Sequence, residues 1–183
     1  MKIALIVGHE KKAQGASNAN GETEYSINGR LAPLIAQALL KHGHEPVIVY
    51  RDGTTYSKLP KRVNQTQADI ALSLHCNAFN TKATGSEVLH YVNSTNSERL
   101  ASLVQTEVVQ ALGLRDRGLR PVDAKHKGRK GDKGGHLCKY TAMPCVIVEY
   151  CFIDNDNDLA TAIKHFEQLA LAIATGAMAY AET

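Results

Sequence analysis

Residues 3–9 read Ile3-Ala-Leu-Ile-Val-Gly-His9, an apolar run that stops at a glycine. An apolar run without alternation predicts a short strand that is buried on both faces, as in a parallel sheet. Four further strands are predicted along the chain from apolar and β-branched runs. They lie at residues 45–50, 70–74, 87–92 and 146–150.

Helical patterns separate these strands. From Glu24 onward, apolar side chains recur at helical spacing, with Thr23 as a candidate N-cap and Gly43 as the glycine that ends the helix. Pro33 lies inside this pattern and predicts either a kink or a break. Further helices are predicted at residues 60–68, 97–112 and 156–181, the last as one helix or two.

The alternation of strands and helices predicts an α/β fold. We expect a mainly parallel twisted sheet of about six strands, flanked by helices on both faces. The 183 residues fit a single domain, residues 1–183, and 44% hydrophobic with 21% charged residues is typical of a globular protein. This composition excludes disordered and collagen-like chains. No apolar run approaches the ~20 residues that span a bilayer, so no stable membrane insertion is expected.

The charge and the cysteines further restrict the functions that this chain could have. The net charge of +3 is too small to predict a nucleic-acid partner. Residues 114–135 are rich in charge and glycine without periodicity, which predicts a long loop, and His126 and His136 are interpreted as surface residues. The four cysteines form no CxxC pair and are expected to be free, buried thiols. No secretory signal is recognised, so synthesis in the cytoplasm is expected.

Polar side chains follow the ends of several predicted strands. His9 and His75 each come just after a strand, Glu149 lies near the end of another, and Glu24 opens the first helix. In parallel sheets, ligands bind at the carboxyl ends of the strands. Two imidazoles and a carboxylate form a common ligand set for catalytic zinc, and a second carboxylate can act as general base and acid.

Each of these residues also has an ordinary explanation. A lone histidine at a strand end is usually a polar surface or core residue, and Glu24 suits the first turn of a helix because of the helix dipole. Glu149 is harder to explain, since it interrupts an apolar run where burial of a carboxylate is costly. Their joint occurrence favours a functional site.

The same residues stand in motifs that resemble a known family. Val7-Gly8-His9, Glu24-x-x-x-Asn28, Ser73-Leu-His75-Cys-Asn77-Ala78, Gly85-Ser-Glu87 and Pro144-x-x-x-x-Glu149-x-x-Phe152-x-x-Asn155 occur in the order found in zinc-dependent N-acetylmuramoyl-L-alanine amidases. This family includes autolysins and the catalytic domains of phage endolysins. The resemblance covers essentially the whole chain. One departure is Glu10-Lys11-Lys12, where many members have glycines; the role of Glu10 stays unassigned.

The resemblance implies a role for each site residue. His9, Glu24 and His75 would bind one zinc ion, and Glu149 would be the catalytic residue. Glu22 competes with Glu24 as a ligand, but the family's Glu-x-x-x-Asn pattern favours Glu24. Asn77 would contact a ligand or the substrate, or would only cap the strand end.

The resemblance also implies a biological setting. The substrate would be peptidoglycan, cut between N-acetylmuramic acid and L-alanine. The absence of tryptophan argues against a separate wall-binding module, which favours an endolysin that acts on the wall after a holin-type pore releases it. The basic residues between 115 and 133 would then form a solvated loop, attract anionic wall polymer, or close as a flap over the cleft.

Other functions remain open at this point. A related zinc carboxypeptidase, or a non-catalytic murein-binding protein of the same fold, would share these motifs. A Cys/His amidase is disfavoured because Cys76 and His75 are adjacent on a strand and point to opposite faces. A nucleotide-binding protein is disfavoured because no glycine-rich phosphate loop follows the first strand.

Overall fold

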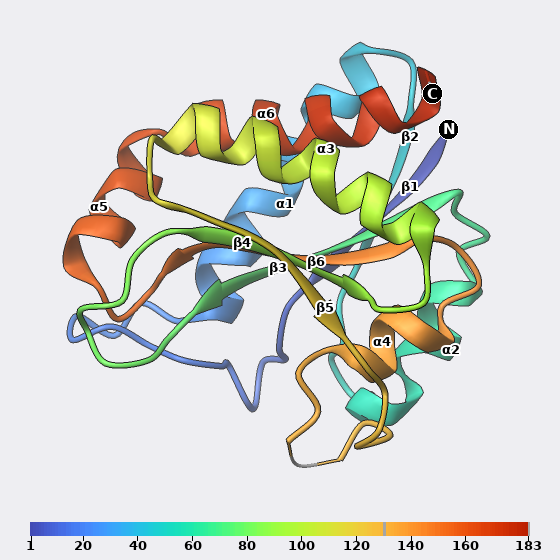
Figure 1. Cartoon of the computed structure of the whole chain (residues 1–183), viewed down its shortest axis with the longest axis horizontal. Coiled ribbons are helices and arrows are strands. Elements are labelled where there is room, and N and C mark those ends of the chain that lie inside the picture. The colour runs from blue at the N-terminus through green and yellow to red at the C-terminus, as the bar shows by residue number, and fades with distance from the viewer. Residues whose placement is uncertain (130, 183) are drawn as a thin grey trace.

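The computed structural model describes residues 1–129 and 131–182, which form an α/β fold around one six-stranded sheet (Figure 1). The fold class predicted from the sequence is therefore confirmed. In the sheet the strands lie in the order β2-β1-β3-β6-β4-β5. Their bounds are β1 Lys2–Val7, β2 Glu45–Val49, β3 Ile70–Asn77, β4 Ser86–Tyr91, β5 Asp116–Val122 and β6 Cys145–Phe152.

Strand direction changes once across the sheet. Strands β2, β1, β3 and β6 pair in parallel, whereas β4 pairs antiparallel with β6, and β5 pairs in parallel with β4. The carboxyl ends of the first four strands therefore meet the amino ends of β4 and β5 at one edge of the sheet. The candidate site lies at this edge.

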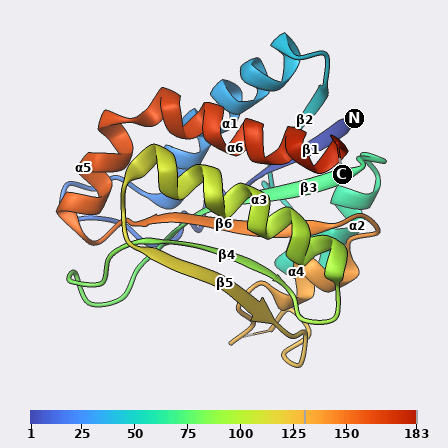
Figure 2. The same cartoon turned by 45° about the horizontal axis from the view of Figure 1, so that its top comes forward.

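Helices cover both faces of the sheet, as Figures 1 and 2 show. The long helices α1, α3 and α6 pack on one face, and the short helices α2 and α4 lie on the other. Their bounds, with α5 and two 3-10 turns, are α1 Glu24–Lys41, α2 Leu59–Asn64, α3 Thr95–Leu112, α4 Gly135–Tyr140, α5 Asp156–Lys164, α6 Phe166–Ala179, η1 Tyr56–Lys58 and η2 Tyr180–Glu182. The C-terminal segment thus forms two helices, one of the two alternatives left by the sequence.

Side chains of the central strands alternate between two buried layers. In β1, Ile3, Leu5 and Val7 belong to the core beneath α1, α3 and α6. Ala4 and Ile6 belong to the smaller core beneath α2 and α4. Because both faces of β1 are buried, its sequence is apolar without alternation, which explains the signal in residues 3–7.

Helix α1 begins and ends where the sequence predicted. The Thr23 hydroxyl accepts a hydrogen bond from the Ser26 amide at 3.2 Å, and Gly43 follows the helix with φ +77°. The helix continues from Glu24 through Pro33 to Lys41, which excludes the predicted break. Gly113, at φ +62°, ends α3 in the same left-handed conformation.

The long loop predicted at residues 114–135 is wrong. Residues 116–122 form β5, and Gly135 begins α4; Lys130, within the predicted loop, and Thr183 lie outside the described residues. Strand β5 is the last strand of the sheet and is at most half-buried. An edge strand of this kind carries charges and proline and has little apolar patterning. The sequence signal for a strand is therefore weak there.

The cysteines and the helices bear on two expectations that came from composition. All four cysteines are free and buried, as predicted. Among the described residues, no helix is both long and apolar enough to cross a bilayer.

Candidate active site

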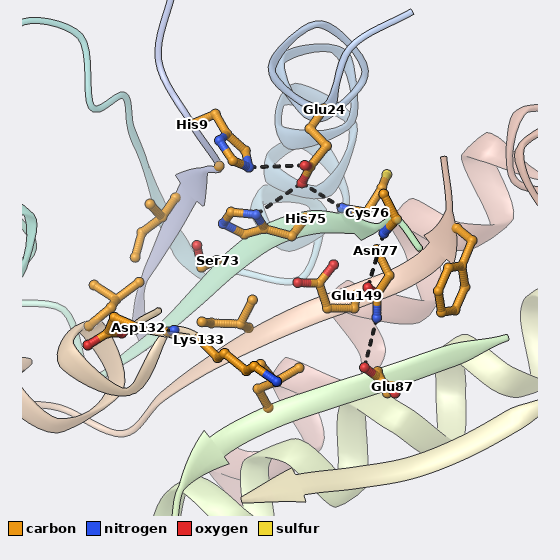
Figure 3. A pocket seen from close by; sticks show the side chains of 18 of the residues that line it. His9, Glu24, Ser73, His75, Cys76, Asn77, Glu87, Asp132, Lys133 and Glu149 are labelled. Atoms are coloured by element: carbon orange, nitrogen blue, oxygen red, sulfur yellow. Dashed lines mark hydrogen bonds and ion pairs between the residues drawn. The ribbon is translucent and has the colours of Figure 1, made fainter. Parts of the chain in front are cut away.

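Three side chains from separate elements converge at the carboxyl edge of the sheet. His9 follows β1, His75 lies near the carboxyl end of β3, and Glu24 is the first residue of α1. Glu24 lies between the two imidazoles: its Oε1 is 3.1 Å from His9 Nε2 and its Oε2 is 3.1 Å from His75 Nδ1 (Figure 3). One ligand atom from each residue lies within 4.8 Å of the others, so the group could hold a metal ion.

The backbone around these side chains is closely packed. His9 has φ +66°, in the left-handed region that non-glycine residues seldom adopt. A Cβ atom on Gly8 would lie 2.4 Å from the Leu74 carbonyl oxygen and 2.7 Å from the His75 ring. A Cβ atom on Gly15 would meet both His9 and Glu24. The two glycines therefore leave the space that the histidines and the glutamate occupy.

We expect Gly8→Ala to lower both stability and metal binding. The new methyl group overlaps backbone and the His75 ring, so the free energy of unfolding should fall by about 1–3 kcal/mol. Urea denaturation and metal titration of the variant measure the two effects. Gly29→Ala is the matched control, because it lies in α1 with open space around it and should raise stability by about 0.5–1 kcal/mol. Wild-type metal affinity in Gly8→Ala would contradict this packing argument.

Glu24 is held as a carboxylate. Burial by itself raises the pKa of Glu24, but hydrogen bonds and charge from His75 and His9 outweigh it, so that the pKa is well below its usual range. Its oxygens also accept hydrogen bonds from the amides of Ala16 and Cys76, at 2.9 and 3.2 Å. A buried carboxylate in this position favours a cation beside it.

Glu149 lies next to this group on β6. In the parallel register it pairs with His75, and its side chain points into the same cavity (Figure 3). Its Oε2 is buried and has no hydrogen-bond partner among the described residues. Burial raises the pKa of Glu149 well above its usual range, and the carboxylates of Glu24 and Glu87 raise it further.

This raised pKa has a consequence for stability in the metal-free protein. The folded state binds a proton at Glu149 more tightly than the unfolded chain does, so protonation of Glu149 stabilises the fold. This stabilisation is complete below the unfolded pKa of about 4.3 and is lost as the pH rises through the folded pKa. Glutamine has the same shape but does not ionise, so the Glu149→Gln variant does not lose this stability as the pH rises. We expect the variant to be more stable than wild type by about 0.5–2 kcal/mol at pH 7, with no difference at pH 4. Urea denaturation in a chelating buffer at both pH values measures this, and parallel pH profiles would disprove it.

A second polar group lies beside Glu149 where β4 and β5 begin. Glu87, the second residue of β4, forms ion pairs with Nε of Arg117 at 2.8 Å and with Nε of Arg120 at 3.0 Å. Its other oxygen accepts a hydrogen bond from Asn77 Nδ2 at 2.8 Å, while Asn77 Oδ1 accepts one from the Ala78 amide. Asn77 therefore caps the strand end and also connects β3 to Glu87.

One cleft of about 810 Å³ is lined by these side chains, with the exception of Arg120. Its floor is the face of the sheet that carries Ser73, Ile147 and Glu149, and its far wall includes Lys133 from the segment before α4. Asp132 anchors that segment: its Oδ1 accepts hydrogen bonds from the amides of Gly134 and His136, at 3.0 and 3.1 Å. This part of the predicted loop is thus folded against the cleft.

The sequence of residues 3–179 matches the model of one protein family, described as N-acetylmuramoyl-L-alanine amidase. The chain belongs to this amidase family. Among its relatives, it is 32% identical over 187 residues to the N-acetylmuramoyl-L-alanine amidase LytC of Bacillus subtilis, covering 97% of this chain and 35% of LytC. It is 26% identical to the endolysin of Bacillus phage SPP1, covering 88% of this chain and 58% of that protein. The chain therefore spans only part of the length of these relatives.

Solved structures of other proteins share the fold. The N-acetylmuramoyl-L-alanine amidase from Clostridium difficile 630 superposes with a TM-score of 0.86 at 24% identity, covering 100% of this chain and 97% of that one. The catalytic domain of the CD27L endolysin, which targets the same species, superposes with a TM-score of 0.80 at 27% identity, covering 98% of this chain and 97% of that one. The family resemblance drawn from the motifs is confirmed.

Several residues that the sequence raised as candidates lie outside the cleft of this amidase-family chain. Glu22 pairs with Arg30 at 2.7 Å and does not line the cleft. Glu10 does not line the cleft, and His126 is exposed. His136 is the second residue of α4 and is half-buried, and its Nε2 lies 3.0 Å from the Ser57 carbonyl oxygen.

Cys76 points away from the histidines of the amidase-family site. Its Sγ is 3.8 Å from the Sγ of Cys151 in the core beneath α1, α3 and α6. Burial raises the pKa of the Cys76 thiol well above its usual range, which disfavours the thiolate that a nucleophile needs. This arrangement leaves no Cys/His pair at residues 75 and 76.

Arg117 lines the cleft but was not predicted as a site residue from the sequence. The site was expected at the carboxyl ends of strands, but β4 and β5 run in the opposite direction and bring their first residues to the same edge. The Gly85-Ser-Glu87 motif lies beside Arg117 in the sheet, but no role was drawn from it.

Proposed function

We propose that this chain is a zinc-dependent N-acetylmuramoyl-L-alanine amidase that cuts the amide between N-acetylmuramic acid and L-alanine in peptidoglycan. The observation that carries the proposal is one cleft that holds the His9–Glu24–His75 group beside the buried carboxyl of Glu149. Membership of the amidase family supports peptidoglycan as the substrate. The residues 1–183 would act as one catalytic domain.

The three residues fit zinc by their chemistry. Two imidazole nitrogens and one carboxylate oxygen are ligands that zinc prefers, and three protein ligands leave one position open in a catalytic site. Their closest atoms are already gathered within 4.8 Å, with the charge of Glu24 stabilised between the two rings. When bound, zinc would polarise the substrate carbonyl and lower the pKa of water.

Glu149 would move the proton in this reaction. As a carboxylate, it accepts a proton from the water that attacks the carbonyl carbon. It then donates this proton to the nitrogen of the departing L-alanine, so that the C–N bond breaks and a neutral amine leaves. A raised pKa suits both steps, because it makes the carboxylate a stronger base and keeps the proton available near neutral pH.

The test is digestion of purified murein by the zinc-loaded protein, with products identified by mass spectrometry. Stem peptides with a free L-alanine amino group, released from intact glycan strands, are the expected result. Cleavage between stem residues instead would favour a carboxypeptidase. Murein that stays intact, with zinc bound, would refute the amidase proposal.

We further propose that the biological role is that of a phage or prophage endolysin. Similarity to the phage SPP1 endolysin and to the CD27L catalytic domain supports this role, while similarity to LytC points to a bacterial autolysin as the competing role. In the endolysin role, the protein is made in the cytoplasm and reaches murein through a holin-type pore.

Controlled expression in a bacterium whose murein the protein digests separates these roles. Turbidity should stay constant when the protein is expressed alone and should fall once a pore-forming holin is co-expressed. Lysis without the pore, or recovery of the protein outside intact cells, would contradict the endolysin role.

A further inference from the structure

We infer that Arg117 binds a carboxylate of the stem peptide and thereby gives the cleft a preference for murein whose glutamate is not amidated. This inference rests on the proposed function and names part of its substrate. Arg117 lines the cleft together with Glu149, Asn77 and Phe152. It is the second residue of β5 and reaches the site because β5 begins at this edge.

The guanidinium of Arg117 is fixed from two sides. Its Nε donates to Glu87 Oε2 at 2.8 Å, and its Cζ lies 5.0 Å from the centroid of the Phe152 ring. Nη1 and Nη2 of Arg117 make no hydrogen bond with any described residue. An arginine held in this way presents two parallel N–H donors, which match the two oxygens of a carboxylate.

The charge around this group also favours an anion. Glu87 is paired with both Arg117 and Arg120, so two guanidinium groups meet one carboxylate and one positive charge remains. Elsewhere on the cleft wall, Arg51 and Lys133 have no ion pair among the described residues. The cleft wall therefore carries cationic side chains that its ion pairs with carboxylates leave available to an anion.

The proposed substrate carries a matching group close to the bond that is cut. In the stem peptide, L-alanine is followed by a D-glutamate that is joined through its side chain, so its α-carboxylate is free. Some murein carries a carboxamide at this position. A carboxamide has no charge and offers one acceptor oxygen, so it cannot take both donors of the guanidinium.

Arg120 provides a matched comparison within the same network. It pairs with the same Glu87 oxygen through the same atom and carries the same charge, but it does not line the cleft, and its side chain is 48% exposed against 25% for Arg117. Arg120→Gln therefore removes one charge and one ion pair with Glu87. Arg117→Gln removes these and the contact with the cleft.

The experiment uses synthetic muramoyl-tripeptides that end in an L-lysine amide and carry either D-glutamate or D-isoglutamine. A third substrate carries D-isoglutamine with a free terminal carboxylate. We expect wild type to have a kcat/KM about 10- to 100-fold higher on the glutamate substrate, mainly through KM, because hydrogen bonds to a charged group are strong. Arg117→Gln should abolish this preference, Arg117→Lys should keep a small part of it, and Arg120→Gln should retain it.

Three results would overturn the inference. They are equal kcat/KM of wild type on the glutamate and isoglutamine substrates, an equal loss of preference in Arg117→Gln and Arg120→Gln, and a preference that follows the terminal carboxylate. Thermal unfolding of each variant shows whether it is folded, and Arg117→Lys keeps the test informative if Arg117→Gln is not.

A binding measurement separates this inference from the proposed function. Calorimetric titration of the zinc-loaded Glu149→Gln variant with the same tripeptides reports the preference without hydrolysis. If wild type cuts none of the substrates but the carboxylate peptide binds about 10-fold tighter, the amidase reaction is wrong and the role of Arg117 stands. If wild type cuts the substrates and both peptides bind equally, the reaction stands and the role of Arg117 is wrong.

Discussion

Glu149→Ala should lower the rate of murein hydrolysis by about 10²- to 10⁴-fold while the protein keeps its zinc. This is the usual contribution of a general acid–base residue, and Glu149 is the carboxyl in the cleft that has neither a hydrogen-bond partner for its buried oxygen nor a place in the His9–Glu24–His75 group. Release of stem peptides, measured with the zinc content of the same sample, gives both quantities.

The outcome distinguishes a catalytic role from a structural one. Because the buried charge of Glu149 opposes folding, the variant should not be less stable than wild type at pH 7. Glu98→Ala makes the same change on an exposed residue of α3 and should leave the rate unaltered. Turnover within a few-fold of wild type in Glu149→Ala would exclude it as the group that moves the proton.

Glu24→Gln should remove tight zinc binding and, with it, hydrolysis. The substitution keeps the size of the side chain but removes the charge that lies between His9 and His75. Even changes to residues that only support a ligand cost 10- to 100-fold in metal affinity, so loss of a ligand charge should cost more than about 100-fold. Zinc content after dialysis, and the rise of Tm on adding zinc, measure this effect.

Glu22→Gln is the control that the sequence itself supplies. Glu22 lies two residues away and was the competing ligand, but its carboxylate pairs with Arg30 instead. This variant should retain zinc, the rise of Tm on adding zinc, and hydrolysis. If Glu22→Gln lost zinc and Glu24→Gln kept it, the ligand group inferred from the structure would be wrong.

Much of the site could be predicted because its parts lie at the carboxyl ends of central parallel strands. Strands β1, β3 and β6 are buried on both faces, so each appears in the sequence as an apolar run. A histidine or glutamate at the end of such a run stands out. The choice of Glu24 over Glu22 as a ligand rested on the resemblance, and in the structure Glu24 lies between the two histidines.

The remaining part of the cleft could not be predicted from local patterns. Strand β5 lies at the sheet edge, where side chains are at most half-buried, so its charged sequence resembled a loop. Helix α4 has six residues, too few to show a helical period. Strand β5 was therefore hidden within the segment interpreted as a long loop, and α4, which overlaps that segment only at Gly135, was not predicted.

Apolar patterning alone was enough to predict the α/β class, the central strands and the residues at their ends, because burial on two faces constrains every residue of a central strand. The direction of β4 and β5 depends instead on pairing between strands far apart in the sequence, which local patterns do not encode. That reversal brings Glu87 and Arg117 to the edge where His75 and Glu149 lie. The tertiary contacts thus add the charged wall of the cleft to the ligand group that the sequence predicted.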